Sequence, residues 1–133
     1  MVGFAGETEE EFAASLAFAE EIAFAKVHVF AYSRRPGTKA YNMGGQLTNA
    51  VKEARSREMI RVTTETQRQF FATQIGRTES VLFERAVQPG VYEGYSMNYT
   101  PILASSGRDI SGQILPVVIE NCTEEYCIGK LRT

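Results

Sequence analysis

The side chains with the most evident chemistry lie together in a short polar segment, Ser33-Arg-Arg-Pro-Gly-Thr38. Arginine, serine and threonine side chains offer hydrogen-bond donors that suit an anion. Pro36 fixes its own φ angle and Gly37 tolerates a positive φ, so the segment is predicted to turn sharply. We therefore expect an anionic ligand at this turn, contacted by Arg34 and Arg35.

The segment before the turn, residues 26–32, is predicted to be a strand. Its apolar residues alternate with period two and include β-branched and aromatic side chains. A helical pattern lies on each side, at about residues 8–24 and 49–74, and the first opens with a capping box of Thr8 and Glu11. Helix, strand and helix in this order are typical of an α/β sheet, in which ligands bind beyond the carboxyl ends of the strands. The polar turn lies at that end.

The formal net charge of −2 hides an uneven distribution along the chain. Residues 1–25 carry six acidic side chains and no Lys or Arg, and residues 78–133 carry a net charge of −3. Residues 26–77 carry ten basic and three acidic side chains, a net charge of +7. We expect a polyanion to be attracted to this middle third. The alternative interpretation is that the basic side chains only form the solvated face of one long helix.

The character of the sequence changes near Gly76. Five short segments with strand propensity follow, separated by turn signals, and a closed barrel would leave them no exposed edges. We therefore expect an α+β chain, in which residues 1–75 hold the helix–strand–helix part and residues 76–133 form a small five-stranded antiparallel β-barrel. The predicted strands are residues 78–84, 92–96, 99–104, 112–119 and 126–132.

Cys122 and Cys127 are the only cysteines. Two thiols cannot complete a structural zinc site, and a disulfide framework is not expected. The chain has no apolar run near 18 residues and no basic leader before an apolar stretch. We therefore expect a cytoplasmic protein with no membrane partner.

Four motifs in order carry a resemblance to a known family. Any one of them is weakly specific, but together they span nearly the whole chain at consistent spacing. The motifs are Gly3-Phe-Ala-Gly-Glu-Thr-Glu-Glu-Glu-Phe12, His28-Val-Phe-Ala-Tyr-Ser-Arg-Arg-Pro-Gly-Thr38, Gln46 with Val51-Lys52 and Arg55, and Gly94-Tyr-Ser-Met-Asn-Tyr99. Their order resembles the C-terminal part of the radical S-adenosylmethionine tRNA methylthiotransferases, most closely the subfamily that methylthiolates threonylcarbamoyladenosine in tRNA.

The resemblance implies that residues 1–75 are the end of a partial (β/α)6 barrel and that residues 76–133 are a TRAM domain, a small OB-like RNA-binding barrel. It implies tRNA and the missing N-terminal part of the parent protein as partners. The S-adenosylmethionine side would be lined by Gly3, Gly6, Glu7, Phe30, Tyr32 and Ser33. RNA would be contacted by Arg34, Arg35, Lys39, Lys52, Arg55, Tyr95, Asn98 and Tyr99. Two alternatives are that the tyrosines belong to the barrel core and that the arginines of the turn pair with the acidic first helix.

The family's reaction uses S-adenosylmethionine and two [4Fe-4S] clusters, one of them held by a Cys-x-x-x-Cys-x-x-Cys motif that this sequence lacks. We therefore expect no catalytic residue, metal site or cofactor in this chain alone, and no methylthiotransferase activity. Ala5 and Ala31 stand where the family usually has proline. Competing interpretations are a stand-alone RNA-binding module, a structural fragment, and a related methylthiotransferase acting on isopentenyladenosine or on a ribosomal protein.

Overall fold

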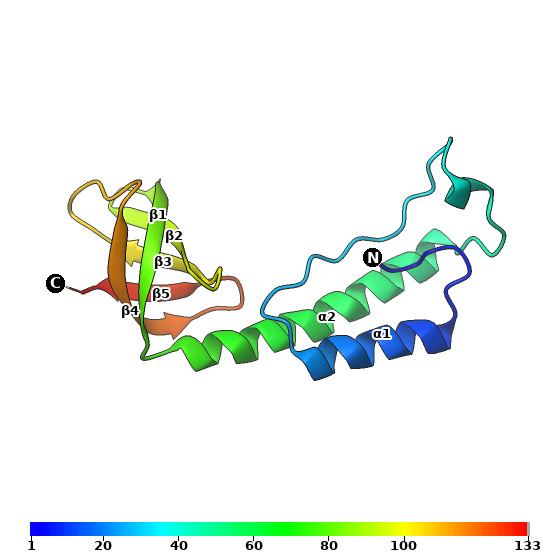
Figure 1. Cartoon of the computed structure of the whole chain (residues 1–133), viewed down its shortest axis with the longest axis horizontal. Helices are drawn as coiled ribbons and strands as arrows, with labels where there is room; N and C mark the ends of the chain where they lie inside the picture. Colours follow the sequence, from blue (N-terminus) through cyan, green and yellow to red (C-terminus); the bar gives the residue numbers. More distant parts are fainter. Residues whose placement is uncertain (133) are drawn as a thin grey trace. The chain divides into compact units, whose positions relative to one another are not determined.

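The computed structural model describes residues 1–132. Packing divides the chain into two compact units between Gln67 and Arg68, and each unit is described by itself. Two main helices followed by five strands confirm the expected α+β class. The elements labelled in Figure 1 are α1 (Glu9–Ile22), α2 (Asn49–Gln74), β1 (Thr78–Gln88), β2 (Val91–Ser96), β3 (Pro101–Ser105), β4 (Ile114–Cys122) and β5 (Cys127–Leu131), and a 3₁₀ helix, η1, spans Lys39–Asn42.

Helix α1 begins where its capping box predicts. The Thr8 side chain accepts a hydrogen bond from the Glu11 backbone N–H, and the Glu11 carboxylate accepts one from the Thr8 N–H. The helix lies alongside α2 in the first unit (Figure 1), and its buried residues Phe12 and Ala19 pack in one cluster with Met59 of α2. This small cluster, which also includes the buried Val2, is the apolar core of the first unit.

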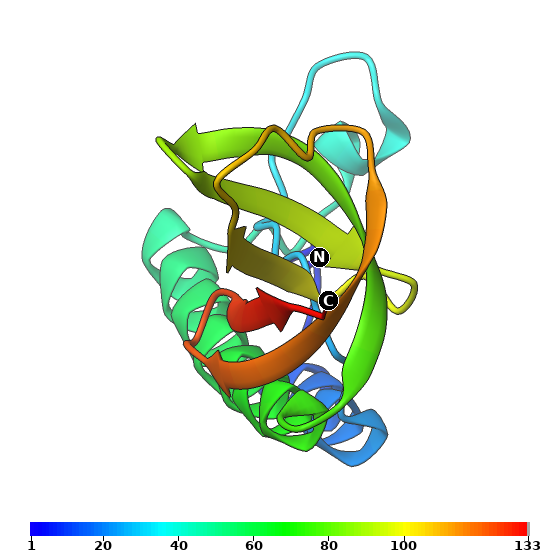
Figure 2. The same ribbon diagram turned by 90° about the vertical axis from the view of Figure 1, so that its left-hand side faces the viewer.

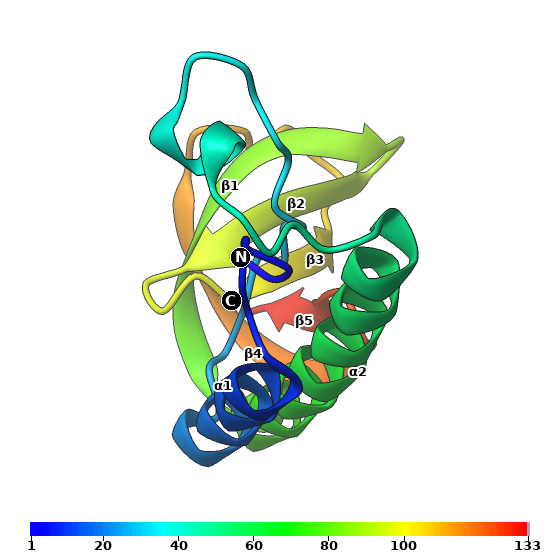
Figure 3. The same cartoon turned by 90° about the vertical axis from the view of Figure 1, so that its right-hand side faces the viewer.

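The strand predicted at residues 26–32 is not formed, and this part of the prediction is wrong. A single parallel bridge joins Val2 to Ala31. It is made by the Val2 N–H donating to the Phe30 carbonyl and the Tyr32 N–H donating to the Val2 carbonyl, each at 2.8 Å. Figure 3 shows the N-terminal segment running beside the segment that follows α1. An alternating pattern becomes a strand only where a neighbour supplies a ladder, and here only one residue does. Among the described residues, the first unit therefore holds no sheet beyond this bridge.

Helix α2 has the predicted bounds, and its last turns serve the second unit. Phe71 is almost fully buried in the barrel core, and Gln74 is buried as well. Gly76 follows with a φ of +87°, and its N–H donates to the Ile119 carbonyl of β4 at 2.7 Å. Glycine adopts this left-handed conformation without strain, which allows the chain to leave the helix and enter β1.

The five strands close into a barrel in the order β1-β2-β3-β5-β4 (Figure 2). Four of the five pairings are antiparallel, but β3 and β5 pair in parallel with Leu103 opposite Ile128. The prediction of a closed five-stranded barrel is confirmed, and the prediction that it is wholly antiparallel is wrong. The core is filled by inward-facing side chains such as Val81, Phe83 and Ile102, all fully buried.

Cys122 and Cys127 are joined by a disulfide, which corrects the expectation of two separate thiols. They end β4 and begin β5 and lie directly opposite each other in the antiparallel register. The bond therefore closes the short turn between these two strands. Among the described residues, no helix is both long enough and apolar enough to cross a membrane.

Candidate functional site

A hollow of about 460 Å³ lies in the first unit where the polar turn meets the first residues of α2. We call it the Lys52 hollow. One wall is the segment from Ala31 to Arg34, which the bridge to Val2 holds in place. The other wall is the start of α2, with Asn49, Lys52 and Glu53. The predicted ligand-binding residues Tyr32, Ser33, Arg34 and Lys52 are thus brought together.

Lys52 is the most unusual residue of the hollow because it is buried, with 9% of its surface exposed. Its aliphatic stem lies over Gly3, where a Cβ would come within 2.7 Å of the Lys52 Cγ, so the glycine leaves the space that the lysine fills. The ammonium lies 5.1 Å from the centre of the Tyr32 ring. Within residues 1–132, Lys52 forms no ion pair with a carboxylate.

The Tyr32 hydroxyl is buried and has no hydrogen-bond partner among the residues that the structure describes. Its ring is fixed by an edge contact with Phe4, at 5.1 Å between centroids, and by the Lys52 ammonium on its face. A buried hydroxyl without a partner costs free energy unless a ligand or a water completes it. Tyr32 therefore offers a hydrogen bond that none of residues 1–132 uses.

Arg34 is held beside the hollow by the loop that follows it. Its Nε donates to the Tyr41 carbonyl at 2.8 Å, and its guanidinium lies 4.4 Å from the centre of the Tyr41 ring. The Gln46 amide fixes this loop by donating to the carbonyls of Ala40 and Met43. Tyr41 is not among the residues predicted from the sequence, because its contact with Arg34 depends on how the loop folds.

The start of α2 contributes the positive end of its helix dipole to the hollow. Thr48 caps the helix, since its hydroxyl accepts from the Val51 N–H at 3.3 Å, and the first turn holds no acidic residue. Helix amino termini favour anions. Glu53 follows and lines the hollow as well, so the charged side chains there are two cations and one anion. Glu53 is not predicted from the sequence, because its place in the lining depends on how the start of α2 packs beside the polar turn.

Glu7 and Arg55, predicted for two different ligands, instead contact each other. Arg55 Nη1 lies 2.8 Å from the Glu7 carboxylate, and Arg55 Nη2 lies 3.1 Å from that of Glu9. The side chains of Arg55 and Glu7 are 6% and 14% exposed. Burial by itself lowers the pKa of Arg55, but the hydrogen bonds to the two carboxylates outweigh it and raise that pKa above the ordinary arginine value. Glu7 also accepts from the Gly3 N–H.

The remaining residues predicted in the first unit lie at its surface. Phe30 is 66% exposed, and Arg35 and Lys39 are exposed without lining the hollow. Gly6 has a φ of +81°, and its N–H donates to the Gly45 carbonyl at 2.8 Å. The structure therefore gathers four of the eleven predicted residues of this unit around one hollow.

The predicted tyrosines of the barrel are on its outer surface. Tyr95 and Tyr99 are 40% and 83% exposed, and they line a shallow hollow with Leu82, Met97 and Ile114. Asn98 lies between them, but its side chain is engaged: its oxygen accepts from Ser96 and Thr100, and its nitrogen donates to the Gln74 side chain at 3.1 Å. Asn98 thus shapes the turn that presents Tyr99.

A scan against models of known protein families finds no match for this chain. Within residues 1–132, no three His, Cys, Asp or Glu side chains gather into a group that could hold a metal ion.

Proposed function

We propose that this chain binds tRNA as the C-terminal part of a tRNA methylthiotransferase, most like those that act on threonylcarbamoyladenosine, and that the Lys52 hollow holds a backbone phosphate. The observation that carries the proposal is the buried residue Lys52, which forms no ion pair within residues 1–132, beside the buried Tyr32 hydroxyl, which none of these residues hydrogen-bonds. An ammonium without a carboxylate partner next to an unused hydroxyl donor favours a site that an anion completes.

The charges of the hollow suit a singly charged phosphate. A phosphodiester oxygen can accept from the Lys52 ammonium and from the Tyr32 hydroxyl, while Arg34 supplies a second positive charge. The amino terminus of α2 adds favourable backbone dipoles. Glu53 opposes this field, and the net charge of the lining is low. The hollow therefore favours a diester of an RNA backbone over a polyphosphate.

Contacts between the motifs support the family assignment. Gly3 of the first motif makes room for Lys52 of the third, and Glu7 pairs with Arg55. Val2 pairs in parallel with Ala31 of the second motif. Segments that are about 30 to 50 residues apart thus meet as one structural unit, and a parallel bridge is the pairing that neighbouring strands of a β/α barrel use.

The second unit supports RNA binding independently. A closed five-stranded barrel with this strand order is OB-like, an architecture that commonly binds oligonucleotides. The exposed Tyr95 and Tyr99 offer rings on which unpaired bases can stack.

The residues present fit only part of the chemistry that the family uses. Both cysteines are joined in the disulfide, so the described chain offers no thiolate for an iron–sulfur cluster. Of the residues expected around S-adenosylmethionine, Tyr32 and Ser33 line the hollow, whereas Glu7 is engaged by Arg55. The engagement of both cysteines in the disulfide and of Glu7 by Arg55 favours, as a second candidate, a stand-alone RNA-binding module.

Fluorescence anisotropy with an unmodified tRNA transcript tests the proposal. We expect weak binding in the range of about 10⁻⁴–10⁻⁶ M, falling steadily as salt is raised from about 50 to 200 mM. Lys52→Met keeps the apolar stem and removes the ammonium, and Arg34→Gln removes the second charge. Each variant should weaken binding several-fold and reduce the log–log salt slope by roughly 0.7–0.9.

Lys26→Gln is the matched control, because Lys26 is exposed in the same unit and does not line the hollow. It should leave the affinity nearly unchanged. Thermal melts establish that each variant is folded. Equal affinity of the Lys52→Met variant and the parent chain at low salt would show that the hollow is not an RNA contact.

A further inference from the structure

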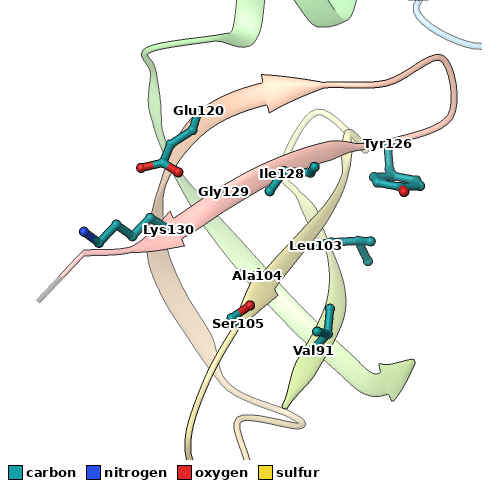
Figure 4. Close-up of a pocket in the computed structure, with 9 residues that line it drawn as sticks. All are labelled: Val91, Leu103, Ala104, Ser105, Glu120, Tyr126, Ile128, Gly129 and Lys130. Atoms are coloured by element: carbon teal, nitrogen blue, oxygen red, sulfur yellow. The ribbon is translucent and has the colours of Figure 1, made fainter. Parts of the chain in front are cut away.

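The barrel carries another hollow, which neither the predicted residues nor the proposed function uses. It measures about 340 Å³ and lies over β3 and β5, beside the start of β2 and the turn between β4 and β5 (Figure 4). We call it the barrel hollow. The side chains that the argument uses are Leu103, Ser105, Glu120, Tyr126, Ile128 and Lys130.

The parallel pairing of β3 with β5 determines which side chains lie next to each other on the floor of the hollow. Leu103 lies opposite Ile128, and both are at least partly exposed on the outer face of the barrel. Two residues further along each strand, on the same face, are Ser105 and Lys130. The floor of the hollow thus holds an apolar cross-strand pair, Leu103 and Ile128, which we call the Leu103–Ile128 step. The polar residues Ser105 and Lys130 follow it along the same two strands.

The two ends of the hollow differ. Figure 4 shows the Glu120 and Lys130 side chains at one end and the Tyr126 ring at the other. Glu120 lies where the β4–β5 register shifts, an irregularity that can re-aim a side chain. Neither the Glu120 carboxylate nor the Lys130 ammonium has an ion-pair or hydrogen-bond partner in the part of the chain that the structure describes.

We propose that the barrel hollow binds one unpaired nucleotide of RNA. The base lies on the Leu103–Ile128 step and against the Tyr126 ring, the Lys130 ammonium contacts a phosphate, and the Glu120 carboxylate accepts a hydrogen bond from the ribose 2′-hydroxyl. This inference rests on the proposed function, since it names a second point at which the same RNA is held.

Charge complementarity selects this occupant. A ribonucleotide presents a flat apolar face at one end and, at the other, an anionic phosphate next to a hydroxyl donor. These groups match an aromatic ring at one end and an adjacent cation and acceptor at the other. An apolar peptide side chain would cover Leu103 and Ile128 but leave both charges unused. A deoxynucleotide would lack the donor for Glu120, so the site prefers RNA to DNA.

The test uses the ¹⁵N-labelled full chain with hexauridylate RNA and with hexadeoxyuridylate, which differs only in the 2′-hydroxyls. We expect amide shifts at Ile128 and Gly129 with RNA, and tighter binding of RNA than of DNA by several-fold. Tyr126→Leu should weaken both ligands roughly ten-fold. Lys130→Gln should weaken both and lower the salt slope by roughly 0.7. Glu120→Gln should remove the preference for RNA and leave DNA binding nearly unchanged.

Glu124→Gln and Arg108→Gln are the matched controls, since both residues are exposed on loops of the barrel and neither lines the hollow. They should not change the RNA preference or the affinity beyond a small factor. Circular dichroism establishes that the barrel is folded in every variant.

The outcomes separate this inference from the proposed function. Binding with shifts confined to residues 31–53, weakened by Lys52→Met but not by Tyr126→Leu, would overturn the barrel hollow and leave the proposed function standing. Equal binding of RNA and DNA by the parent chain would also overturn it. An apolar hexapeptide that shifts Ile128 and Gly129 when RNA does not would replace it with a peptide site. If neither the hexamer nor tRNA binds, both proposals are wrong.

Discussion

Replacing Arg55 by methionine should destabilise the first unit more than any other single loss of charge on α2. Methionine keeps most of the apolar stem but removes the donors that reach the Glu7 carboxylate, the Glu7 carbonyl and the Glu9 carboxylate. Glu7, whose side chain is only 14% exposed, would remain as a largely buried carboxylate supported by the Gly3 N–H alone.

The expected magnitude follows from these contacts. Removing one partner of a buried ion pair costs about 3–5 kcal/mol. Glu9 is 87% exposed and can turn to solvent, so only the Glu7 part of the pair counts fully. We therefore expect the Arg55→Met substitution to lower the unfolding free energy by the lower end of this range, about 3 kcal/mol. In a unit of this size that corresponds to a fall of about 12 °C or more in the melting midpoint.

Far-ultraviolet circular dichroism reports the melting of α1 and α2 and is the assay. Arg61→Met is the matched control, because Arg61 pairs with Glu58 at an exposed position of the same helix. It should leave the midpoint unchanged within error. The double variant Arg55→Met with Glu7→Gln should recover much of the loss, because it leaves no uncompensated carboxylate. Equal midpoints for Arg55→Met and Arg61→Met would refute the reasoning.

Three further predictions concern local features. Thr8→Ala removes the cap of α1 and should lower the unfolding free energy by about 1 kcal/mol, measured by urea titration. Gly129→Ala places a Cβ against the Val117 side chain and 3.0 Å from the Val118 carbonyl oxygen, so it should destabilise the barrel by about 1–3 kcal/mol, whereas Gly107→Ala, with open space around it, should be neutral. Alkylation before reduction should leave Cys122 and Cys127 unmodified in mass spectra, and modification of both would show that the disulfide is absent.

Elements with local signals could be predicted from the sequence. The capping box at Thr8, the left-handed stop at Gly76 and the helical periodicity of residues 49–74 depend on residues within one or two turns of each other. The barrel strands were predicted within a few residues because turn residues separate them. Their pairing direction was not, since alternation looks the same in parallel and antiparallel strands, and β3 and β5 are separated by the whole of β4.

Contacts between distant residues could not be predicted. Residues 26–32 have the composition of a strand, but strand formation depends on a neighbour, and only Val2 pairs with them. Arg55 looked like an RNA contact because its partner Glu7 lies 48 residues away in the sequence. The disulfide is not predicted because two cysteines are too few for a framework, and their position as a cross-strand pair at the end of a hairpin depends on the strand register.

The net charge counted along the sequence also overstates the positive charge that a polyanion would meet on the folded chain. Several cations of residues 26–77 already have carboxylate partners, among them Arg55 with Glu7 and Glu9, Arg61 with Glu58, and Arg77 with Glu79. Such cations release fewer counterions when RNA binds, because carboxylates already neutralise them. Lys52 differs, since it is positioned by Gly3 and Tyr32 rather than by an acid. Attraction should therefore concentrate at Arg34 and Lys52 instead of spreading along α2, and for this reason single substitutions there can separate a built phosphate site from a diffuse basic surface.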